Sequence, residues 1–268
     1  MKNFSFKDKN PNADREDDQM IYGLRPVMEA VKAGKEIDRI FIGRTAKGEL
    51  MQELKNLLRE ENIPWTEVPE DKLNRFTRKN HQDVVCFISA ISYHSLGQLL
   101  PSIFEKGETP FLLVLDRITD VRNFGAIART AECAGVHAIV IPSRGAAQVT
   151  SDAIRTSAGA LNRIPVCRES NLKNTVTYLQ QSGVLVVAAT EKGKEYHFQN
   201  DLNGPLAVVM GSEEDGVSPE LIRICDKLLR IPMIGTISSL NVSVACGIML
   251  YEAIRQRIVA EGMTTKTN

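Results

Sequence analysis

Three polar clusters in the second half of the chain follow apolar stretches and carry residue types that bind anions, hydroxyl groups or hydrogen-bond donors. The first cluster is DRITDVRNFGAIART, which contains Asn123, Gly125 and Arg129. Asn caps helices and tolerates left-handed backbone, so a purely structural reading explains Asn123 and Gly125 as a turn entering a helix. Arg129 lies among apolar residues. Its guanidinium therefore either extends to solvent or binds an anion, and both readings stay open.

The second cluster, GSEEDGVSPE, follows the apolar run LAVVM. Gly211 would let another group approach the backbone closely. The three consecutive acids at 213–215, including Glu213, either are a solvated loop or bind a cation or a donor-rich substrate. Ser218 is predicted to be the N-cap of a helix whose first residue is Pro219.

The third cluster is the segment IGTISSLNVSVACG, which follows KLLRIPM. Residues 240–244 alternate between apolar and polar as in a strand, whereas residues 248–254 have helical spacing. We interpret the segment as a loop that enters the last helix. Free N–H groups at such a helix start can donate to a carbonyl or carboxylate of a ligand, close to Ser239 and Asn241.

The sequence predicts that alternating strands and helices position these three clusters. The first apolar run begins at Phe111, and further runs cover residues 138–141, 183–189, 206–210 and 228–231. Helices are predicted between and after them, at 124–135, 151–160, 172–182, 218–226 and 241–258. Continuous apolar runs are typical of parallel strands buried on both faces. Ligands of such sheets bind at the carboxyl ends of the strands, where all three clusters fall.

The first third of the chain predicts a second, smaller α/β domain. A helix ending at Gly34 precedes a strand at 37–42, a leucine-rich helix precedes a strand at 65–68, and a basic stretch at 72–79 leads into a strand at 84–88. We predict a disordered tail at 1–18, the small domain at 19–96, a linker at 97–109, the larger domain at 110–262 and a tail at 263–268.

Charge and composition exclude several function classes. The net charge is zero, so the whole molecule is not drawn to nucleic acid or membrane, although residues 110–168 hold seven arginines and four acids. Phosphate binding and an ordinary solvated surface explain those arginines equally well. The five scattered cysteines predict buried, reduced thiols in a cytoplasmic protein. The histidines are scattered as well, so we expect no metal site. The sequence has no apolar run of about 18 residues, so we expect no membrane-spanning helix. The nucleotide-binding motifs GxGxxG and GxxxxGK[ST] and the hydrolase motif GxSxG are all missing from the sequence.

Taken together, the three clusters resemble the ordered motifs of the SpoU (TrmH-type) RNA 2′-O-ribose methyltransferases of the SPOUT superfamily. DVRNFGAIARTA, GSEEDG and IPMIGTISSLNVSVA match in order, and IYGLRPVMEAV and NHQDVVCFIS resemble the L30e-like substrate-binding domain of the branch that methylates a guanosine in 23S ribosomal RNA. The resemblance implies an α/β fold: a C-terminal parallel-sheet, Rossmann-like SPOUT domain with a trefoil knot, plus the small L30e-like domain. General topology rules would argue against a knot, so that expectation rests on the resemblance.

The resemblance also implies S-adenosylmethionine as cofactor, ribosomal RNA as substrate and a homodimer with the active site near the subunit contact. The catalytic set it implies is Asn123, Arg129, Glu213, Ser239 and Asn241. The cofactor-binding set it implies, mainly through backbone, is Thr190, Met210, Gly211, Ile231, Met233 and Leu240.

The family model often makes the Arg of the first motif the base that takes the proton of the ribose 2′-OH. A guanidinium is permanently protonated in proteins, so we prefer Arg129 as an electrostatic partner of the RNA phosphate and the developing alkoxide, and leave the base open. Two other functions compete with methylation of 23S rRNA: the same chemistry on tRNA or another rRNA site, and a non-enzymatic RNA-binding scaffold.

Overall fold

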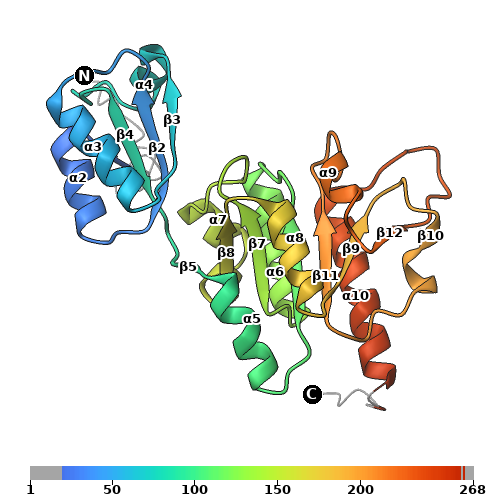
Figure 1. Ribbon diagram of the computed structural model, residues 1–268. Helices are drawn as coiled ribbons and strands as arrows, with labels where there is room; N and C mark the ends of the chain where they lie inside the picture. The colour runs from blue at the N-terminus through green and yellow to red at the C-terminus, as the bar shows by residue number, and fades with distance from the viewer. Residues whose placement is uncertain (1–19, 261, 263–268) are drawn as a thin grey trace, which may run out of the picture. The chain divides into compact units, whose positions relative to one another are not determined.

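The computed structural model describes residues 20–260 and residue 262 (Figure 1). Both predicted tails, 1–18 and 263–268, lie outside the described residues. The chain divides into two compact units between Ala90 and Ile91. Residues 91–96, which we had assigned to the small domain, belong to the larger unit because β5 (Tyr93–His94) pairs with β8 (Val166–Glu169). Helix α5 (Leu96–Glu105) occupies most of the predicted linker at 97–109.

The smaller unit is a four-stranded sheet with helices on both faces. Its strand order is β1 (Met20–Tyr22), β4 (Val84–Ile88), β2 (Ile37–Gly43) and β3 (Trp65–Val68), and only β2 and β3 are parallel. Alternate residues of β2 point to opposite faces. Ile40 and Ile42 therefore pack with α2 (Leu24–Lys32) and α3 (Glu49–Glu60), whereas Phe41 packs with α4 (Glu70–Phe76). The strands predicted at 37–42, 65–68 and 84–88 are present, and β1 was not predicted.

The larger unit is built on an eight-stranded sheet whose paired strands are all parallel, as predicted. The order across the sheet is β10 (Glu195–Tyr196), β12 (Lys227–Arg230), β9 (Leu185–Ala189), β11 (Leu206–Met210), β6 (Phe111–Leu115), β7 (Ala138–Pro142), β8 and β5. The two-residue strands β5 and β10 were not predicted, because two residues carry no readable apolar pattern. β8 was not predicted either, because only its first two residues, Val166 and Cys167, are apolar.

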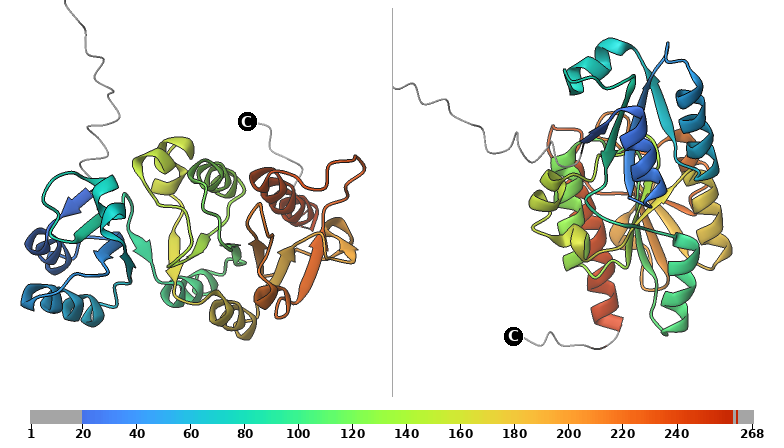
Figure 2. Two further views of the ribbon diagram at one scale, coloured as in Figure 1. Left: turned by 90° about the horizontal axis from the view of Figure 1, so that it is seen from above. Right: turned by 90° about the vertical axis from the view of Figure 1, so that its left-hand side faces the viewer.

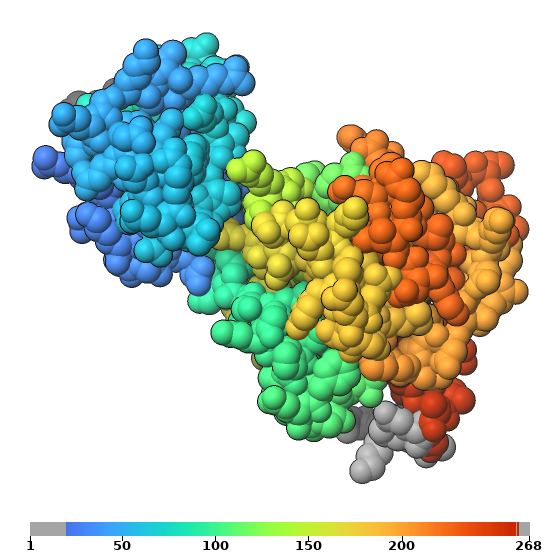
Figure 3. Space-filling model, in the orientation of Figure 1, coloured from blue at the N-terminus to red at the C-terminus, as the bar shows by residue number. Residues whose placement is uncertain are grey.

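Helices cover both faces of this sheet, as the view from above in Figure 2 shows. One layer contains α6 (Val121–Cys133), α7 (Ser151–Thr156) and α10 (Val242–Ala260), and the other contains α5, α8 (Leu172–Gln181) and α9 (Pro219–Ile222). Figure 3 shows the face covered by α5 and α8. The central strands β6 and β11 are buried along their whole length, which explains their unbroken apolar sequence.

Four neighbouring parallel strands position the site. β12, β9, β11 and β6 are adjacent, so their carboxyl ends meet at one edge of the sheet. The chain leaves these ends at Ile231, Thr190, Gly211 and Asp116. The segment 231–241 then runs directly into α10, which confirms that the strand-like alternation at 240–244 belongs to a loop and a helix.

The predicted turn before α6 is wrong, whereas the predicted N-cap position of α9 is confirmed. Asn123 and Gly125 lie inside α6 rather than in a turn before it, because the N-cap is Asp120, whose Oδ1 accepts a hydrogen bond from the backbone N–H of Asn123 at 2.8 Å. Gly125 instead permits close helix packing, since a Cβ there would lie 2.7 Å from Cβ of Thr156 in α7. Ser218 occupies the N-cap position of α9, but its side chain makes no capping hydrogen bond.

Candidate active site

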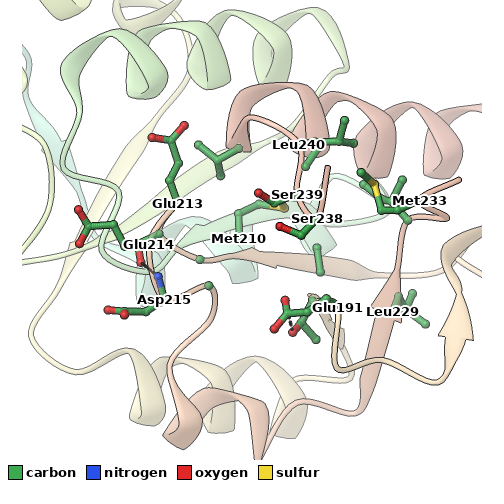
Figure 4. Close-up of a pocket in the computed structure, with 18 residues that line it drawn as sticks. Glu191, Met210, Glu213, Glu214, Asp215, Leu229, Met233, Ser238, Ser239 and Leu240 are labelled. Carbon is green, nitrogen blue, oxygen red and sulfur yellow. Dashed lines mark hydrogen bonds between the residues drawn. The ribbon is translucent and has the colours of Figure 1, made fainter. Parts of the chain in front are cut away.

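A cavity of about 400 Å³ opens at the carboxyl ends of β9, β11 and β12 (Figure 4), and we call it the strand-end cavity. Its volume falls in the range of small-molecule sites, which is about 300–1,000 Å³. Much of its wall is apolar or backbone, including Ala189, Leu229, Val242 and Ala245. All six residues of the predicted cofactor set line it: Thr190, Met210, Gly211, Ile231, Met233 and Leu240.

Backbone contacts hold the floor of this cavity. The N–H of Thr190 donates to the carbonyl of Leu229 at 2.9 Å, and the N–H of Asp116 donates to the carbonyl of Met210 at 2.8 Å. A Cβ at position 211 would lie 2.0 Å from the backbone carbon of Gly216, so only glycine fits there. The close approach that we predicted for Gly211 is therefore to the chain itself, where it closes the loop Gly211–Gly216.

A second cavity, of about 240 Å³, lies beside the first and is lined mainly by polar side chains. We call it the polar cavity; its walls are Arg117, Ile118, Thr119, Asp120, Asn123, Val242 and the residues Ser212, Glu213, Glu214 and Asp215. Residues 212–215 and Val242 line both cavities. In Figure 4, Glu213 and Glu214 lie at one side of the strand-end cavity, opposite Leu229 and Met233. The loop Gly211–Gly216 is thus a wall shared by two sites of different chemical character.

Three of the five predicted catalytic residues form one hydrogen-bonded cluster. Oε1 of Glu213 accepts from Nδ2 of Asn123 at 2.9 Å and from Nδ2 of Asn241 at 2.8 Å. Nδ2 of Asn241 also donates to Oδ1 of Asn123 at 3.0 Å, and Oδ1 of Asn241 accepts from the N–H of Ser243 at 3.0 Å. The cluster joins α6, the loop after β11 and the start of α10, which are separated by 90 and 28 positions in sequence. These bonds fix the orientation of both amides around one carboxylate.

The other two predicted catalytic residues lie apart from this cluster. Ser239 lines the strand-end cavity together with Glu213. Arg129 is exposed on α6, lines neither cavity, and within residues 20–260 and 262 no hydrogen bond or ion pair involves its side chain. Arg129 lies six positions after Asn123, a rise of about 9 Å and an offset of about two-thirds of a turn around the helix axis, so the two side chains point in different directions.

Sequence reasoning missed two residues at the end of β6. Oδ2 of Asp116 accepts from the N–H of Ser218 at 2.6 Å. Arg117 donates from Nη1 to Oδ2 of Asp215 at 3.0 Å and from Nη2 to the carbonyl of Gly216 at 3.0 Å. Although burial lowers the pKa of Arg117, the nearby charges of Asp116 and Asp215 outweigh it and raise that pKa. The available signal was an acid–base pair directly after a buried strand.

The cysteines contribute little to this site. Cys86, Cys167 and Cys246 are buried, and burial raises the pKa of the Cys246 thiol to about 12. Cys133, predicted to be buried, is exposed because it ends α6 on the solvent side. In the described part of the chain, no three His, Cys, Asp or Glu side chains gather where they could hold a metal ion. Nor does any helix of residues 20–260 have the length and apolar character that crossing a bilayer requires.

Comparison with known families matches both units of the chain. The model of the SpoU rRNA Methylase family matches residues 110–251. The model described as RNA 2′-O ribose methyltransferase substrate binding matches residues 20–94. The two matches together span nearly all of the described chain, and the first one contains the strand-end cavity, the polar cavity and the hydrogen-bonded cluster.

Individual proteins give the same result. YacO of Bacillus subtilis (strain 168), assigned to the TrmH family of tRNA/rRNA methyltransferases, is 37% identical over 238 residues, which cover 88% of this chain and 95% of YacO. The 23S rRNA (guanosine-2′-O-)-methyltransferase RlmB of Vibrio vulnificus (strain CMCP6) is 34% identical, covering 91% of this chain and 99% of its own length. The SpoU methyltransferase AviRb of Streptomyces viridochromogenes, solved in complex with the cofactor AdoMet, superposes with a TM-score of 0.57 at 26% identity, covering 90% of each chain.

Proposed function

The chain belongs to the SpoU rRNA methylase family and is an S-adenosylmethionine-dependent RNA 2′-O-methyltransferase, and from this premise we propose that its substrate is a guanosine ribose in 23S ribosomal RNA. The observation that carries the ribose chemistry is the hydrogen-bonded cluster of Asn123, Glu213 and Asn241, in which Glu213 lines both cavities. Similarity to RlmB over both units favours the ribosomal substrate over tRNA. With an enzyme family established, a non-enzymatic scaffold is no longer a competing reading.

The strand-end cavity fits the cofactor. It has room for a small molecule and offers backbone N–H and carbonyl groups at the ends of β9, β11 and β12. We propose that the six predicted residues that line the cavity hold the cofactor, mainly by backbone: Thr190, Met210, Gly211, Ile231, Met233 and Leu240. When bound, S-adenosylmethionine supplies the methyl group on its sulfonium.

The polar cavity receives the target ribose in this proposal. Glu213 holds the two amides of Asn123 and Asn241 in fixed orientation, so that the 2′-hydroxyl meets positioned polar groups rather than mobile ones. Ser239 faces the neighbouring cavity and contacts the ribose from the cofactor side. Positioning of the hydroxyl next to the shared wall contributes much of the rate, because a reaction between two bound groups needs no further loss of translational freedom.

We also propose that Arg129 acts across a homodimer. Its side chain is exposed and lies outside both cavities of its own chain. α10 packs against α6, which carries Arg129, and apolar side chains are exposed on α10 (Val244, Tyr251) and on the loop before it (Ile234, Ile237). Exposed apolar residues at this density favour a subunit contact. A partner that covers them brings its own Arg129 toward this site, where the guanidinium stabilises RNA phosphate and developing alkoxide charge.

Mixing two inactive variants tests this arrangement. Arg129→Ala and Glu213→Ala subunits, each inactive alone, should regain activity when mixed and re-equilibrated, because a heterodimer has one site with both residues intact. Light scattering at several protein concentrations measures the dimer. A mixture that stays inactive while heterodimers form would show that Arg129 does not act in trans.

The smaller unit is proposed to bind the RNA outside the target nucleotide. Lys72, Arg75, Arg78 and Lys79 are exposed along and after α4. Binding through phosphates releases counterions, so the RNA affinity should fall steeply with salt. A flat salt response in a filter-binding titration would contradict this role.

Two finer features of the fold are part of the proposal: the L30e-like identity of the smaller unit and a trefoil knot in the larger one. β12 pairs with β9 on one side, yet α10, which follows it, packs against β11 and α6. The segment 231–241 therefore crosses the ends of β9 and β11, as a threaded chain would. A crystal structure traced through residues 185–260 would test the threading directly.

Methyl mapping tests the substrate. The protein is incubated with labelled S-adenosylmethionine and total RNA from a strain that lacks the corresponding gene, and the labelled nucleotide is located by nuclease digestion and mass spectrometry. We expect one 2′-O-methylguanosine in 23S rRNA. Label found only in tRNA would contradict the proposed 23S rRNA substrate. Label on a base would contradict methylation of the ribose.

A further inference from the structure

Arg117 follows β6 in an unusual backbone conformation. Its φ is +60°, in the left-handed region that side chains with a Cβ disfavour and glycine adopts freely. The described chain therefore has an arginine at a position where glycine would be free of backbone strain. Strain of this kind persists where the surrounding structure holds the residue, and it points to a task for the side chain.

The side chain of Arg117 contacts the loop that forms the wall between the two cavities. Nη1 binds Oδ2 of Asp215 and Nη2 binds the carbonyl of Gly216, both at 3.0 Å. A planar guanidinium offers several donors in a fixed fork, so two contacts from one side chain restrain position and angle together. A lysine could not make this pair of contacts with the same geometry.

Hydrogen bonds close the loop Gly211–Gly216 at its base. Ser212 and Gly216 exchange backbone hydrogen bonds at 3.2 and 2.9 Å, and the N–H of Asp215 donates to Oγ of Ser212 at 3.2 Å. Glu213 and Glu214 are therefore at the tip, and Arg117 binds the closing side of the same turn. A shift of Asp215 or Gly216 would move Glu213 away from the amides of Asn123 and Asn241.

We propose that Arg117 is a positioning residue for methyl transfer, which acts by fixing the loop Gly211–Gly216 so that Glu213 meets Asn123 and Asn241. The inference rests on the proposed function of that cluster. The guanidinium itself need not touch the substrate. The competing role is a direct contact with an RNA phosphate, because the side chain of Arg117 is 37% exposed and lines the polar cavity.

Arg117→Gly is the informative variant, because glycine suits φ +60° and removes only the side chain. Its single-turnover rate with saturating RNA and cofactor should fall about 10- to 100-fold, since a misplacement of about 1 Å can cost that much. The affinity for RNA should stay within about threefold, the scale of an ordinary surface substitution. The affinity for S-adenosylmethionine should fall by less than the rate does, because the same loop also lines the strand-end cavity. Arg117→Lys should give an intermediate rate, and it replaces Arg117→Gly in every comparison if the glycine variant does not fold.

Arg223→Gly is the matched control. Arg223 is an exposed arginine at the end of α9, and no side-chain hydrogen bond or ion pair joins it to another residue of the described part of the chain. Its loss should leave rate and affinities unchanged. Circular dichroism and thermal unfolding of all variants check that they fold.

A double-mutant cycle with Glu213→Gln distinguishes positioning from direct contact. If Arg117 acts through Glu213, then Arg117→Gly should lower the rate in the natural background and have little further effect in the Glu213→Gln background. Equal losses in both backgrounds would overturn the inference. A weaker RNA affinity with a smaller salt slope would also overturn it, in favour of a phosphate contact.

The same cycle separates this inference from the proposed function. If Glu213→Gln lowers the rate and Arg117→Gly does not, only the role of Arg117 fails. If Glu213→Gln itself has no effect, the proposed cluster fails, and the role of Arg117 fails with it.

Discussion

The strand-end cavity and the polar cavity share a wall but are built from different parts of the chain. The first is lined largely by apolar side chains and by the backbone where β9, β11 and β12 end. The second is lined by charged and amide side chains such as Arg117, Asp120, Asn123 and Glu213. A site made from backbone tolerates most side-chain changes but no change in chain path. A site made from side chains is sensitive to the loss of a single side chain and less sensitive to a small change in the chain path. Substitutions of the two kinds should therefore affect the two cavities differently.

The largest effect is expected from Gly211→Ala, which changes the path of the chain. The new Cβ would lie 2.0 Å from backbone atoms of Gly216 and Val217, a distance that no rotamer can relieve. We expect a loss of about 3 kcal/mol in the free energy of unfolding and loss of cofactor binding. Thermal unfolding and calorimetry measure both. Normal cofactor affinity in this variant would contradict a backbone-built cavity.

Arg129→Ala should come next. Turnover should fall about 1,000-fold because a permanent positive charge near the developing alkoxide is lost. Cofactor affinity should stay nearly intact, because Arg129 does not line the strand-end cavity. Arg129→Lys is the companion variant, and a lysine enzyme with most of the natural rate would weaken a special role for the guanidinium. Loss of cofactor binding in Arg129→Ala would show that the role assigned to Arg129 is wrong.

Asn123→Ala tests the polar cavity from inside one chain. Its amide donates to Glu213 and accepts from Asn241, so both partners lose orientation when it is removed. We expect the single-turnover rate to fall about 100-fold with an unchanged cofactor dissociation constant. The backbone N–H of residue 123 can still bond Asp120, so the start of α6 should remain intact. An equal loss of cofactor affinity would break the distinction between the two cavities.

The smallest effect is expected from Thr190→Ala. The contact of Thr190 that shapes the strand-end cavity is its backbone N–H, which bonds Leu229 and survives the substitution. The side chain adds only two 3.3 Å contacts, one with Glu191 and one with the N–H of Lys192. Loss of such contacts should weaken cofactor binding by less than about tenfold and leave the rate at saturation unchanged. A large loss of rate would give the Thr190 hydroxyl a role in the reaction.

The sequence predicted what depends on local pattern. Unbroken apolar runs identified the parallel sheet, and the rule that ligands bind at carboxyl ends of strands located the cluster that contains Gly211 and Glu213. Thr190 and Met210 came from the resemblance to a family. The resemblance to a family supplied the cofactor and the roles of Asn123, Glu213 and Asn241. Their catalytic roles stay predictions, although the structure does bring these three side chains together.

The sequence could not predict what depends on distant contacts or on backbone angles. Arg117 binds Asp215 across 98 positions, and its φ of +60° has no signature in an arginine. Asp120 rather than Asn123 caps α6. The sequence could not predict this, because both residue types cap helices, they lie three residues apart, and only packing decides between them. Strands of two residues, such as β10, are fixed by their neighbours rather than by their own residues.

The loop Gly211–Gly216 gives the enzyme a thermodynamic property as well as a shape. Since one short turn lines both cavities, a molecule that displaces the turn from one cavity also changes the shape of the other. Linkage then requires the effect to be mutual: if cofactor tightens RNA binding by some factor, RNA tightens cofactor binding by the same factor. If the two cavities bind cofactor and RNA as proposed, the order in which the two substrates arrive is therefore a matter of energetic coupling, and not only of access.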